Sequence, residues 1–264
     1  MANEQKDKIL RYYKGIEGEA AAVVLVDLAE SVQKTQKFRL SYFLDPFGQE
    51  IAETVAANYD GIRVDFDGGY PGAERARAMF VHENFPGTPT GFDIACVEAK
   101  WNGQFARLGH RDVLGSLMGL GIDRNRVGDL LVTNDSVRIL CDTKMQQFLL
   151  SDLKRIGSVS VTVSEADPAD IQPKEEHVKE IRTTVASLRV DSIAASGFGS
   201  SRSRAAADIA ADKLKLNWQP VKHASQTVKE GDMLSMRGRG RLEVAEIRGT
   251  TKKGRTVVVL KRYL

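Results

Sequence analysis

The feature that most constrains the fold of this chain is a pair of short helical patterns separated by only a few small residues. Residues 190–195 form the first pattern, and Gly197 offers the left-handed backbone that ends many helices. A second pattern follows at once, where Ser200 or Ser201 can cap the free amides of its first turn. We expect the two helices to form one small unit that the chain leaves at Asn217.

Positive charge is concentrated in the same part of the chain. The 264 residues carry 38 lysines and arginines against 35 aspartates and glutamates, a net charge of +3. Residues 182–264 hold 17 of the basic and 7 of the acidic residues, a balance of +10, so the first 181 residues balance at −7. This asymmetry predicts a polyanionic partner for the last third of the chain.

A helix start that carries serine and arginine is suited to phosphate. The first amides of a helix lack intrahelical partners, and the planar guanidinium of arginine matches phosphate oxygens. We therefore expect a binding set drawn from the helix starts, nearby lysines, a strand end and a hairpin tip: Arg189, Ser201, Arg202, Ser203, Arg204, Lys213, Lys215, Asn217, Arg237, Arg239, Arg241, Lys252 and Lys253. The alternative at the helix start is that Ser201 is only a cap and that Arg204 pairs with Asp208 one turn later.

Composition argues against several classes of site. An apolar content of 42% predicts a globular protein with real cores. Cys96 and Cys141 both lie in apolar runs, which favours buried, reduced thiols over a disulfide or a thiolate metal site. The four histidines lack zinc-type spacing, so we expect no metal, no cofactor, no small-molecule substrate and no catalytic residues. Without a signal peptide or a long apolar run, we expect a cytoplasmic protein with no membrane partner.

The first part of the chain shows helical spacing of apolar residues over residues 6–55, with residues 38–50 as a connection and Pro46 in a turn. Two strand-like runs, residues 62–66 and 76–81, flank a glycine-rich loop and suggest a hairpin. We place the domain boundaries at 1–75 for an N-terminal helical and hairpin domain, 76–165 for an α/β domain, 166–181 for a linker and 182–264 for the basic domain.

The middle domain has the clearest order of elements. Periodicity predicts a strand at 92–99, a helix at 111–120, strands at 129–133 and 137–141, a helix at 143–155 and a strand at 158–163. This order is the split βαβ plan. The central strand at 137–141 offers no aromatic ring on which a base could stack, so base recognition by this sheet has no support in the sequence.

Two further segments are candidates for a secondary contact with RNA. In the glycine-rich loop, Tyr70 could stack on a base and Arg75 could contact phosphate, although glycine and proline there also suit a plain turn. At the predicted helix start, His110 and Arg111 could bind an anion, although capping or packing within the domain is the simpler explanation.

The basic region resembles the S4 RNA-binding domain. The family pattern is present as Arg189 to Asp191, Gly197, Ser201 and Arg202 with Ala205, Ile209, residues 214–217 and residues 228–234, in fixed order over about fifty residues. Two positions depart from the pattern, because Asp212 and Trp218 stand where the family usually has glycine. We expect both departures to affect the geometry of the local turns more than that of the two-helix scaffold.

Other stretches, FLDPFGQEI, FDGGYPGAERARAMF and SMRGRGR among them, are similar to bacterial YlmH-type proteins over nearly the whole chain. The resemblance implies an α+β fold with a helical N-terminal part, an RRM-like (split βαβ) middle domain and a C-terminal S4 domain of two helices plus a small antiparallel sheet. It further implies a non-enzymatic factor that binds structured ribosomal RNA or tRNA, on the large ribosomal subunit, in ribosome-associated quality control. The alternatives are an RNA-modifying enzyme that uses S4 for substrate delivery and a scaffold linked to cell division.

Overall fold

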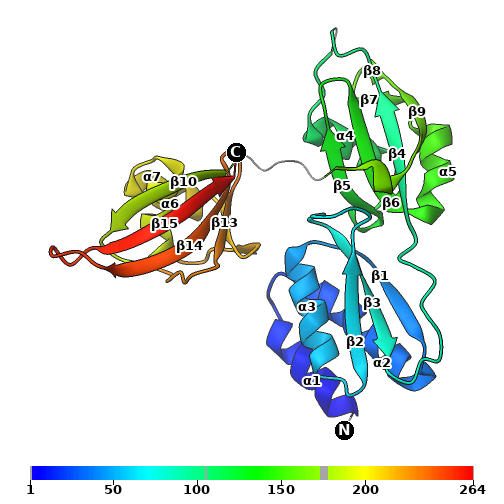
Figure 1. The fold of residues 1–264 in the computed structure, drawn as a ribbon, viewed down its shortest axis with the longest axis horizontal. Helices are drawn as coiled ribbons and strands as arrows, with labels where there is room; N and C mark the ends of the chain where they lie inside the picture. The colour runs from blue at the N-terminus through cyan, green and yellow to red at the C-terminus, as the bar shows by residue number, and fades with distance from the viewer. Residues whose placement is uncertain (1, 105, 173–177, 264) are drawn as a thin grey trace. The chain divides into compact units, whose positions relative to one another are not determined.

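The computed structural model describes residues 2–104, 106–172 and 178–263, and the chain divides into two compact units at residues 173 and 174. Figure 1 shows mixed helices and antiparallel sheets in both units, which is the α+β class expected from the sequence. Each unit is described by itself below.

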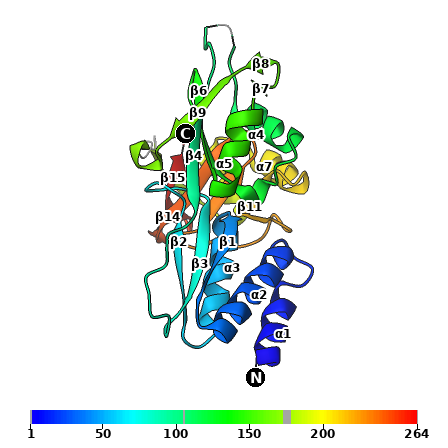
Figure 2. The same cartoon turned by 90° about the vertical axis from the view of Figure 1, so that its right-hand side faces the viewer.

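The N-terminal part of the first unit packs three helices on one face of a three-stranded sheet (Figures 1 and 2). Its elements are α1 (Ala2–Tyr13), α2 (Glu19–Thr35), β1 (Phe38–Leu44), α3 (Pro46–Ala57), β2 (Ile62–Asp67) and β3 (Ala76–His82). The sheet is antiparallel with the order β1-β3-β2.

The segment expected to be a connection is a strand followed directly by a helix. Residues 38–44 pair with β3, so that prediction was wrong. Pro46 is the first residue of α3 rather than part of a turn, because its fixed φ suits a helix start where no amide is needed. Asp45 caps the helix by accepting a hydrogen bond from the Gly48 amide at 2.8 Å.

Strand β3 belongs with the N-terminal helices. It pairs with β1 on one side and β2 on the other, and all seven of its residues are buried. Residue 76 was expected to begin the middle domain, whereas hydrogen bonding places this strand at the centre of the N-terminal sheet. The chain passes to the next sheet only after His82.

The middle part of the first unit has the expected chain order with one addition. Its elements are β4 (Ile94–Lys100), α4 (His110–Gly119), η1 (Arg124–Arg126), β5 (Val127–Val132), β6 (Ser136–Asp142), α5 (Thr143–Asp152), β7 (Arg155–Ile156), β8 (Val159–Ser160), β9 (Thr162–Ala166) and η2 (Pro168–Asp170). The four-stranded sheet has the order β5-β6-β4-β9 and is antiparallel throughout. The small β7-β8 ribbon lies between α5 and the last strand, which therefore begins later than expected.

The two faces of this sheet are covered differently. Helices α4 and α5 pack on one face around a core that includes Val97, Leu117, Ile139 and Leu149. On the other face, Ile171 packs on Cys96 and Leu140. Both cysteines of the chain are buried and free, and burial raises the pKa of the Cys96 thiol to about 11. Residue 171 was expected to lie in a linker, but it completes a core.

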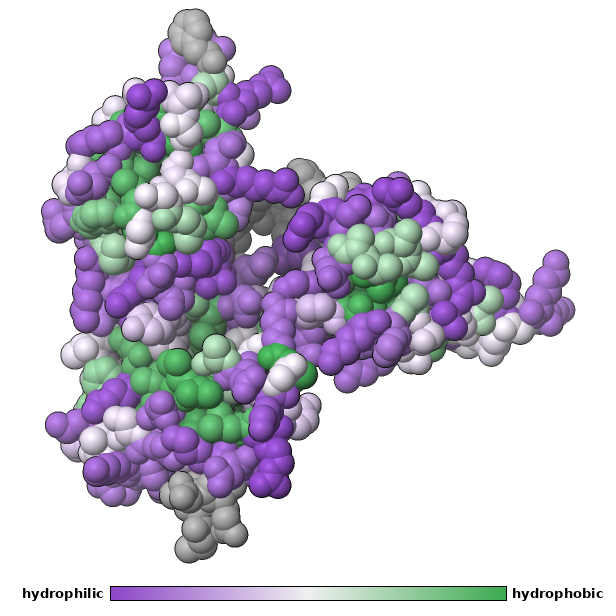
Figure 3. All heavy atoms as spheres, turned by 180° about the vertical axis from the view of Figure 1, so that it is seen from behind, coloured by the Kyte–Doolittle hydropathy of each residue, from purple (hydrophilic) through white to green (hydrophobic). Residues whose placement is uncertain are grey.

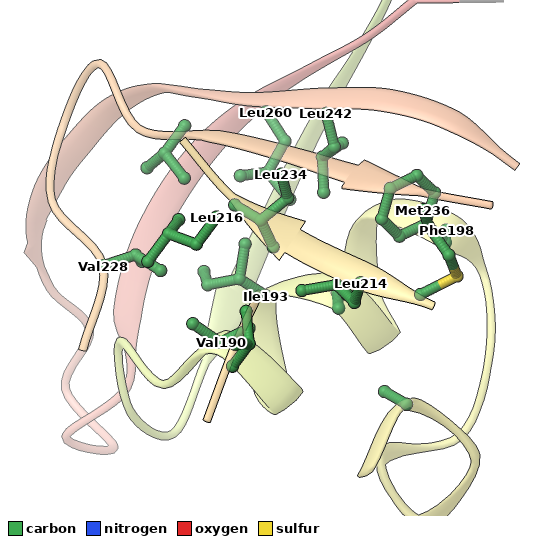
Figure 4. Close-up of a cluster of buried hydrophobic side chains, with 14 of the residues drawn as sticks. Val190, Ile193, Phe198, Leu214, Leu216, Val228, Leu234, Met236, Leu242 and Leu260 are labelled. Carbon is green, nitrogen blue, oxygen red and sulfur yellow. The ribbon is translucent and has the colours of Figure 1, made fainter. Parts of the chain in front are cut away.

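The second unit packs two helices against a six-stranded sheet. Its elements are β10 (Val178–Val185), α6 (Val190–Phe198), α7 (Arg202–Ala210), β11 (Leu214–Leu216), β12 (Gln219–Pro220), β13 (Met233–Met236), β14 (Gly240–Thr250) and β15 (Thr256–Tyr263). The strand order is β10-β15-β14-β13-β11-β12. Figure 4 shows Val190, Ile193 and Phe198 of the helical segment packing against strand residues such as Leu234 and Leu260. Strand β10 starts inside the expected linker and pairs with β15 over its whole length.

The first helix of this unit ends later than the sequence suggested. Gly199, not Gly197, adopts the left-handed conformation at its end, with φ of 65°. Gly197 is instead buried inside α6, where an added Cβ would overlap the side chain of Leu242. The glycine is needed for close packing of helix on sheet.

On the face seen in Figure 3, hydrophilic residues surround several clusters of apolar residues. Tyr12 on α1 and Val23 and Val24 on α2 are among the exposed large apolar side chains. No helix in the described part of the chain combines the length and apolar character that crossing a bilayer requires.

Candidate nucleic-acid interface

The start of α7 has the geometry that the sequence predicted. Ser201 is the N-cap, and its hydroxyl accepts a hydrogen bond from the Arg204 amide at 3.2 Å. Its oxygen also lies 3.0 Å from the hydroxyl of Ser203. The next residues, Arg202 to Arg204, are exposed. A capped, solvent-facing helix start of this kind presents a partial positive charge to an anion.

Asp191 holds two arginines at this position. The carboxylate is only 4% exposed. It accepts hydrogen bonds from Nε and Nη2 of Arg189 at 3.2 and 3.1 Å and from Nε of Arg202 at 3.0 Å. Burial alone would raise the pKa of Asp191, but the hydrogen bonds from Arg189 and Arg202 outweigh it and lower the pKa below its ordinary value. The side chains of Arg189 and Arg202 remain 39% and 49% exposed, so solvent and a ligand can reach them.

Asp208, one turn along α7, repeats the arrangement. It is 5% exposed and accepts a hydrogen bond from Nζ of Lys213 at 3.2 Å, while Nε of Arg204 lies 3.4 Å from its other oxygen. Burial would raise the pKa of Asp208, yet Lys213, Arg204 and Arg239 together lower it. The cap and the i,i+4 pair considered as the alternative are therefore both present. They do not exclude a phosphate site, because the cations stay partly exposed.

The arginine-rich turn between β13 and β14 adjoins this surface. The Arg237 amide donates to the Lys213 carbonyl at 2.9 Å, and Nη1 of Arg239 donates to the Phe198 carbonyl at 3.1 Å. We name Arg189, Arg202, Arg204, Lys213 and Arg239 the α7 basic surface. Contacts with Asp191 and Asp208 gather cations from the starts of both helices and from the turn after α7, and the bond of Arg239 to the Phe198 carbonyl adds a cation from the β13-β14 turn.

Sequence reasoning missed one arginine and the role of Asp191. The guanidinium of Arg262, on β15, lies 5.6 Å from the ring centre of Phe198 and donates to the Arg239 carbonyl at 3.4 Å. Arg241 lies similarly over Tyr263, at 5.5 Å. Basic residues are frequent near the chain end, so the sequence did not single out Arg262. The aspartate two residues after Arg189, in contrast, could have been recognised as the partner of a local ion pair.

Other predicted residues lie apart from this surface or are already engaged. Lys252 and Lys253 lie at the tip of the β14-β15 hairpin, and the length of β14 separates them from Arg241 by roughly 30 Å. Asn217 donates to Asp232 at 2.9 Å and accepts from the Met233 amide at 2.8 Å, so its side chain fixes a turn. Lys215 lies on β11 between two buried leucines.

The candidates for a secondary contact in the first unit are also engaged in structure. Asp129 of β5 accepts hydrogen bonds from the Tyr70 hydroxyl at 2.8 Å and from the Arg75 amide at 3.1 Å. The Arg75 guanidinium donates to the Phe43 carbonyl at 2.8 Å. These bonds clamp the glycine-rich loop onto β5, which accounts for both residues without a ligand.

His110 and Arg111 lie exposed at the start of α4, where Asp112 caps the helix by accepting from the Gly109 amide at 2.8 Å. Desolvation by neighbouring atoms and the positive charge of Arg124 lower the pKa of His110 below its ordinary value, which disfavours the charged ring that a phosphate contact would use.

Among the described residues, no group of three or more histidine, cysteine, aspartate or glutamate side chains is arranged to hold a metal ion.

The two positions that depart from the family pattern both have left-handed backbone, with φ of 51° at Asp212 and 61° at Trp218. This is the conformation that glycine adopts without strain. At both positions the chain thus has a backbone conformation that suits glycine, with residues that do not favour it.

Comparison with known proteins identifies all three parts of the chain. Family models described as "YlmH, N-terminal", "Putative RNA-binding domain in YlmH" and "S4 domain" match residues 18–85, 88–170 and 188–234. The boundary between the first two lies between β3 and β4, where the sheets separate.

Two individual proteins are similar to this chain. The ribosome-associated protein quality control protein P2 of Bacillus subtilis (strain 168) is 32% identical over 231 residues, which cover 88% of this chain and 90% of that protein. The solved structure of the cell division protein ylmH from Streptococcus pneumoniae is 24% identical, with a TM-score of 0.49, over 58% of this chain and 92% of that one. By its three matching segments and its relationship to the Bacillus protein, this chain belongs to the YlmH family and carries a C-terminal S4 RNA-binding domain.

Proposed function

We propose that this chain is a non-enzymatic factor that docks on structured ribosomal RNA or tRNA through its S4 unit, on the large ribosomal subunit, in ribosome-associated quality control. One observation carries the RNA-binding part: two buried carboxylates, Asp191 in the first turn of α6 and Asp208 in the last turn of α7, hold four basic side chains while leaving them partly exposed. The name of the Bacillus relative supports the ribosomal setting.

The arrangement fits recognition of a sugar-phosphate surface. Arginine and lysine contacts to phosphate position a nucleic acid without reading its sequence. A side chain already held by a carboxylate loses less conformational entropy on binding than a free one. The α7 basic surface is therefore suited to a fixed backbone geometry, such as that of a folded RNA.

Charge reversal at the centre of the surface tests the proposal. Arg202→Glu removes one cation and places a repelling charge beside Asp191, so RNA affinity falls by about tenfold or more. Arg248→Glu is the matched control, because Arg248 is exposed in the same unit but lies on the β14 hairpin, paired with Glu246. Filter binding of the two full-length variants to ribosomal RNA measures the difference, and equal losses would place the interface elsewhere.

Salt dependence and ribosome binding separate the proposal from its rivals. If about six phosphates are neutralised, raising salt from 50 to 200 mM weakens binding roughly a thousandfold. Co-sedimentation with purified large and small subunits tests the ribosomal target, and loss of sedimentation after nuclease treatment excludes a scaffold that binds protein alone. Nucleoside analysis of RNA incubated with the protein detects turnover, which would show an RNA-modifying enzyme instead.

A further inference from the structure

The S4 unit contains an open groove of about 570 Å³ that the α7 basic surface does not account for. It lies between the short β11-β12 hairpin and the irregular segment of residues 221–227. Its volume is within the usual range for pockets that hold small ligands.

The groove is bounded by backbone that is firmly held. The Gln226 carbonyl accepts from the Val190 amide at 2.8 Å, and the Ala224 carbonyl accepts from the Asp191 amide at 3.2 Å. These bonds attach the irregular segment to the first turn of α6. The groove is thus formed before any ligand arrives, which lowers the entropic cost of binding.

The side chains that line the groove offer both donors and acceptors of hydrogen bonds. Leu216 and Pro220 supply apolar surface, and seven polar residues surround it: Asn217, whose side chain is bonded to Asp232 and Met233, and six others, Gln219, Lys222, His223, Ser225, Gln226 and Thr227. Within the described residues, none of these six side chains makes a hydrogen bond or ion pair to the rest of the chain. No carboxylate lines the groove, so nothing there repels a phosphate.

The groove continues the α7 basic surface. Thr227 at its edge forms a backbone bridge with Arg189, and Arg189 shares Asp191 with Arg202. An RNA backbone held by Arg189 and Arg202 therefore passes directly beside the groove.

On the basis of the RNA-binding function above, we propose that this groove receives one unpaired nucleobase of the bound RNA. A base needs a flat apolar contact for its face and donors and acceptors for its edge, and the groove supplies both. Lys222 lies where it can meet the phosphate of the same nucleotide. The basic surface would fix the backbone, while the groove distinguishes RNA with an unpaired nucleotide from a continuous duplex.

A pair of matched RNAs tests the groove with the full-length chain. One is a continuous RNA duplex, and the other is the same duplex with a single bulged 2-aminopurine nucleotide. Wild type binds the bulged RNA about tenfold tighter, since good contacts to one base are worth about that factor or more. The fluorescence of 2-aminopurine rises as the base leaves the stack.

The double variant Gln219→Ala/Gln226→Ala removes two exposed amides without touching the core. It binds the bulged RNA only as well as the duplex, and its affinity for the duplex stays within about twofold of wild type. Arg202→Glu, by contrast, weakens both RNAs alike.

The outcomes are distinct. An equal loss on both RNAs in the double variant, or no loss on the bulged RNA, overturns the base-binding groove and leaves the RNA-binding function intact. Failure of wild type to bind either RNA overturns the RNA-binding function itself, and the groove with it.

Discussion

Replacing Asp191 changes RNA affinity through two physical effects that oppose each other. Asp191→Asn adds one unit of positive charge to the α7 basic surface, and charge alone would raise RNA affinity. The same change releases Arg189 and Arg202, because asparagine keeps one acceptor oxygen and turns an NH₂ group toward the guanidinium groups. Immobilising two rotamer-rich side chains on binding costs about 0.5–1.5 kcal/mol each. At physiological salt, the added positive charge contributes less free energy to binding than this immobilisation costs. We therefore expect RNA affinity to fall by about fivefold.

Asp212→Asn is the matched control for charge. Asp212 is exposed beside Lys213 and has left-handed backbone, which asparagine tolerates. The control raises the local charge by the same amount without releasing an arginine, so its RNA affinity rises slightly. Filter binding at one fixed salt concentration compares the three proteins. An increase in affinity for both variants would show that net charge governs binding and that Asp191 does not pre-organise the arginines.

Asp191→Asn also changes the stability of the second unit. Loss of the charge-assisted bonds to Asp191 costs about 1–2 kcal/mol, a value reduced because both guanidinium groups reach water. Since folding lowers the pKa of Asp191, this stabilisation is present above its ordinary pKa and is lost as pH falls through the lowered value. Urea unfolding should therefore show a difference between wild type and variant that is constant from pH 7 to about 5 and shrinks below about pH 4. A difference that persists unchanged in acid would contradict the assignment.

Two further predictions concern packing. Gly197→Ala forces a methyl group against the buried Leu242 and destabilises the second unit by about 1–3 kcal/mol, whereas Gly115→Ala, in open space on α4, stabilises the first unit by roughly 0.5–1 kcal/mol; thermal unfolding checks both signs. Asp129→Ala deprives Tyr70 and the loop amides of their acceptor and destabilises the first unit by about 2 kcal/mol in urea unfolding, and unchanged stability would mean that the loop is not clamped to β5.

The order of elements and the hairpin of β2 with β3 could be predicted from periodicity, but the pairing of β3 with β1 could not. Every residue of this strand is buried, so it lacks the alternation that reports which face meets which layer. Its assignment to a sheet depends on pairing with β1, a strand that was itself taken for a connection because Pro46 suggested a turn. Proline at the first position of a helix gives the same sequence signal as proline in a turn.

The basic residues of the candidate interface could be predicted as a class, because charge asymmetry depends on composition alone. Their grouping could be predicted only in part. The hairpin read from the sequence already implied that Lys252 lies a strand's length from Arg241, since β residues rise about 3.3 Å each. The groove left no sequence signal, because residues 221–227 are irregular and owe their position to bonds with the start of α6.

The turn after β11 connects the unusual residues of this chain to its proposed function. Leu216 pairs with Gln219, so Asn217 and Trp218 form a two-residue hairpin loop in which both have positive φ. Left-handed backbone costs a residue other than glycine about 1–2 kcal/mol, although asparagine tolerates it better. The bonds from Asn217 to Asp232 and Met233 hold the loop in place against that cost. Since the loop carries Gln219 into the wall of the groove, Asn217 would act on RNA binding by fixing the shape of the groove. This role does not require the direct contact with RNA that the sequence predicted for Asn217.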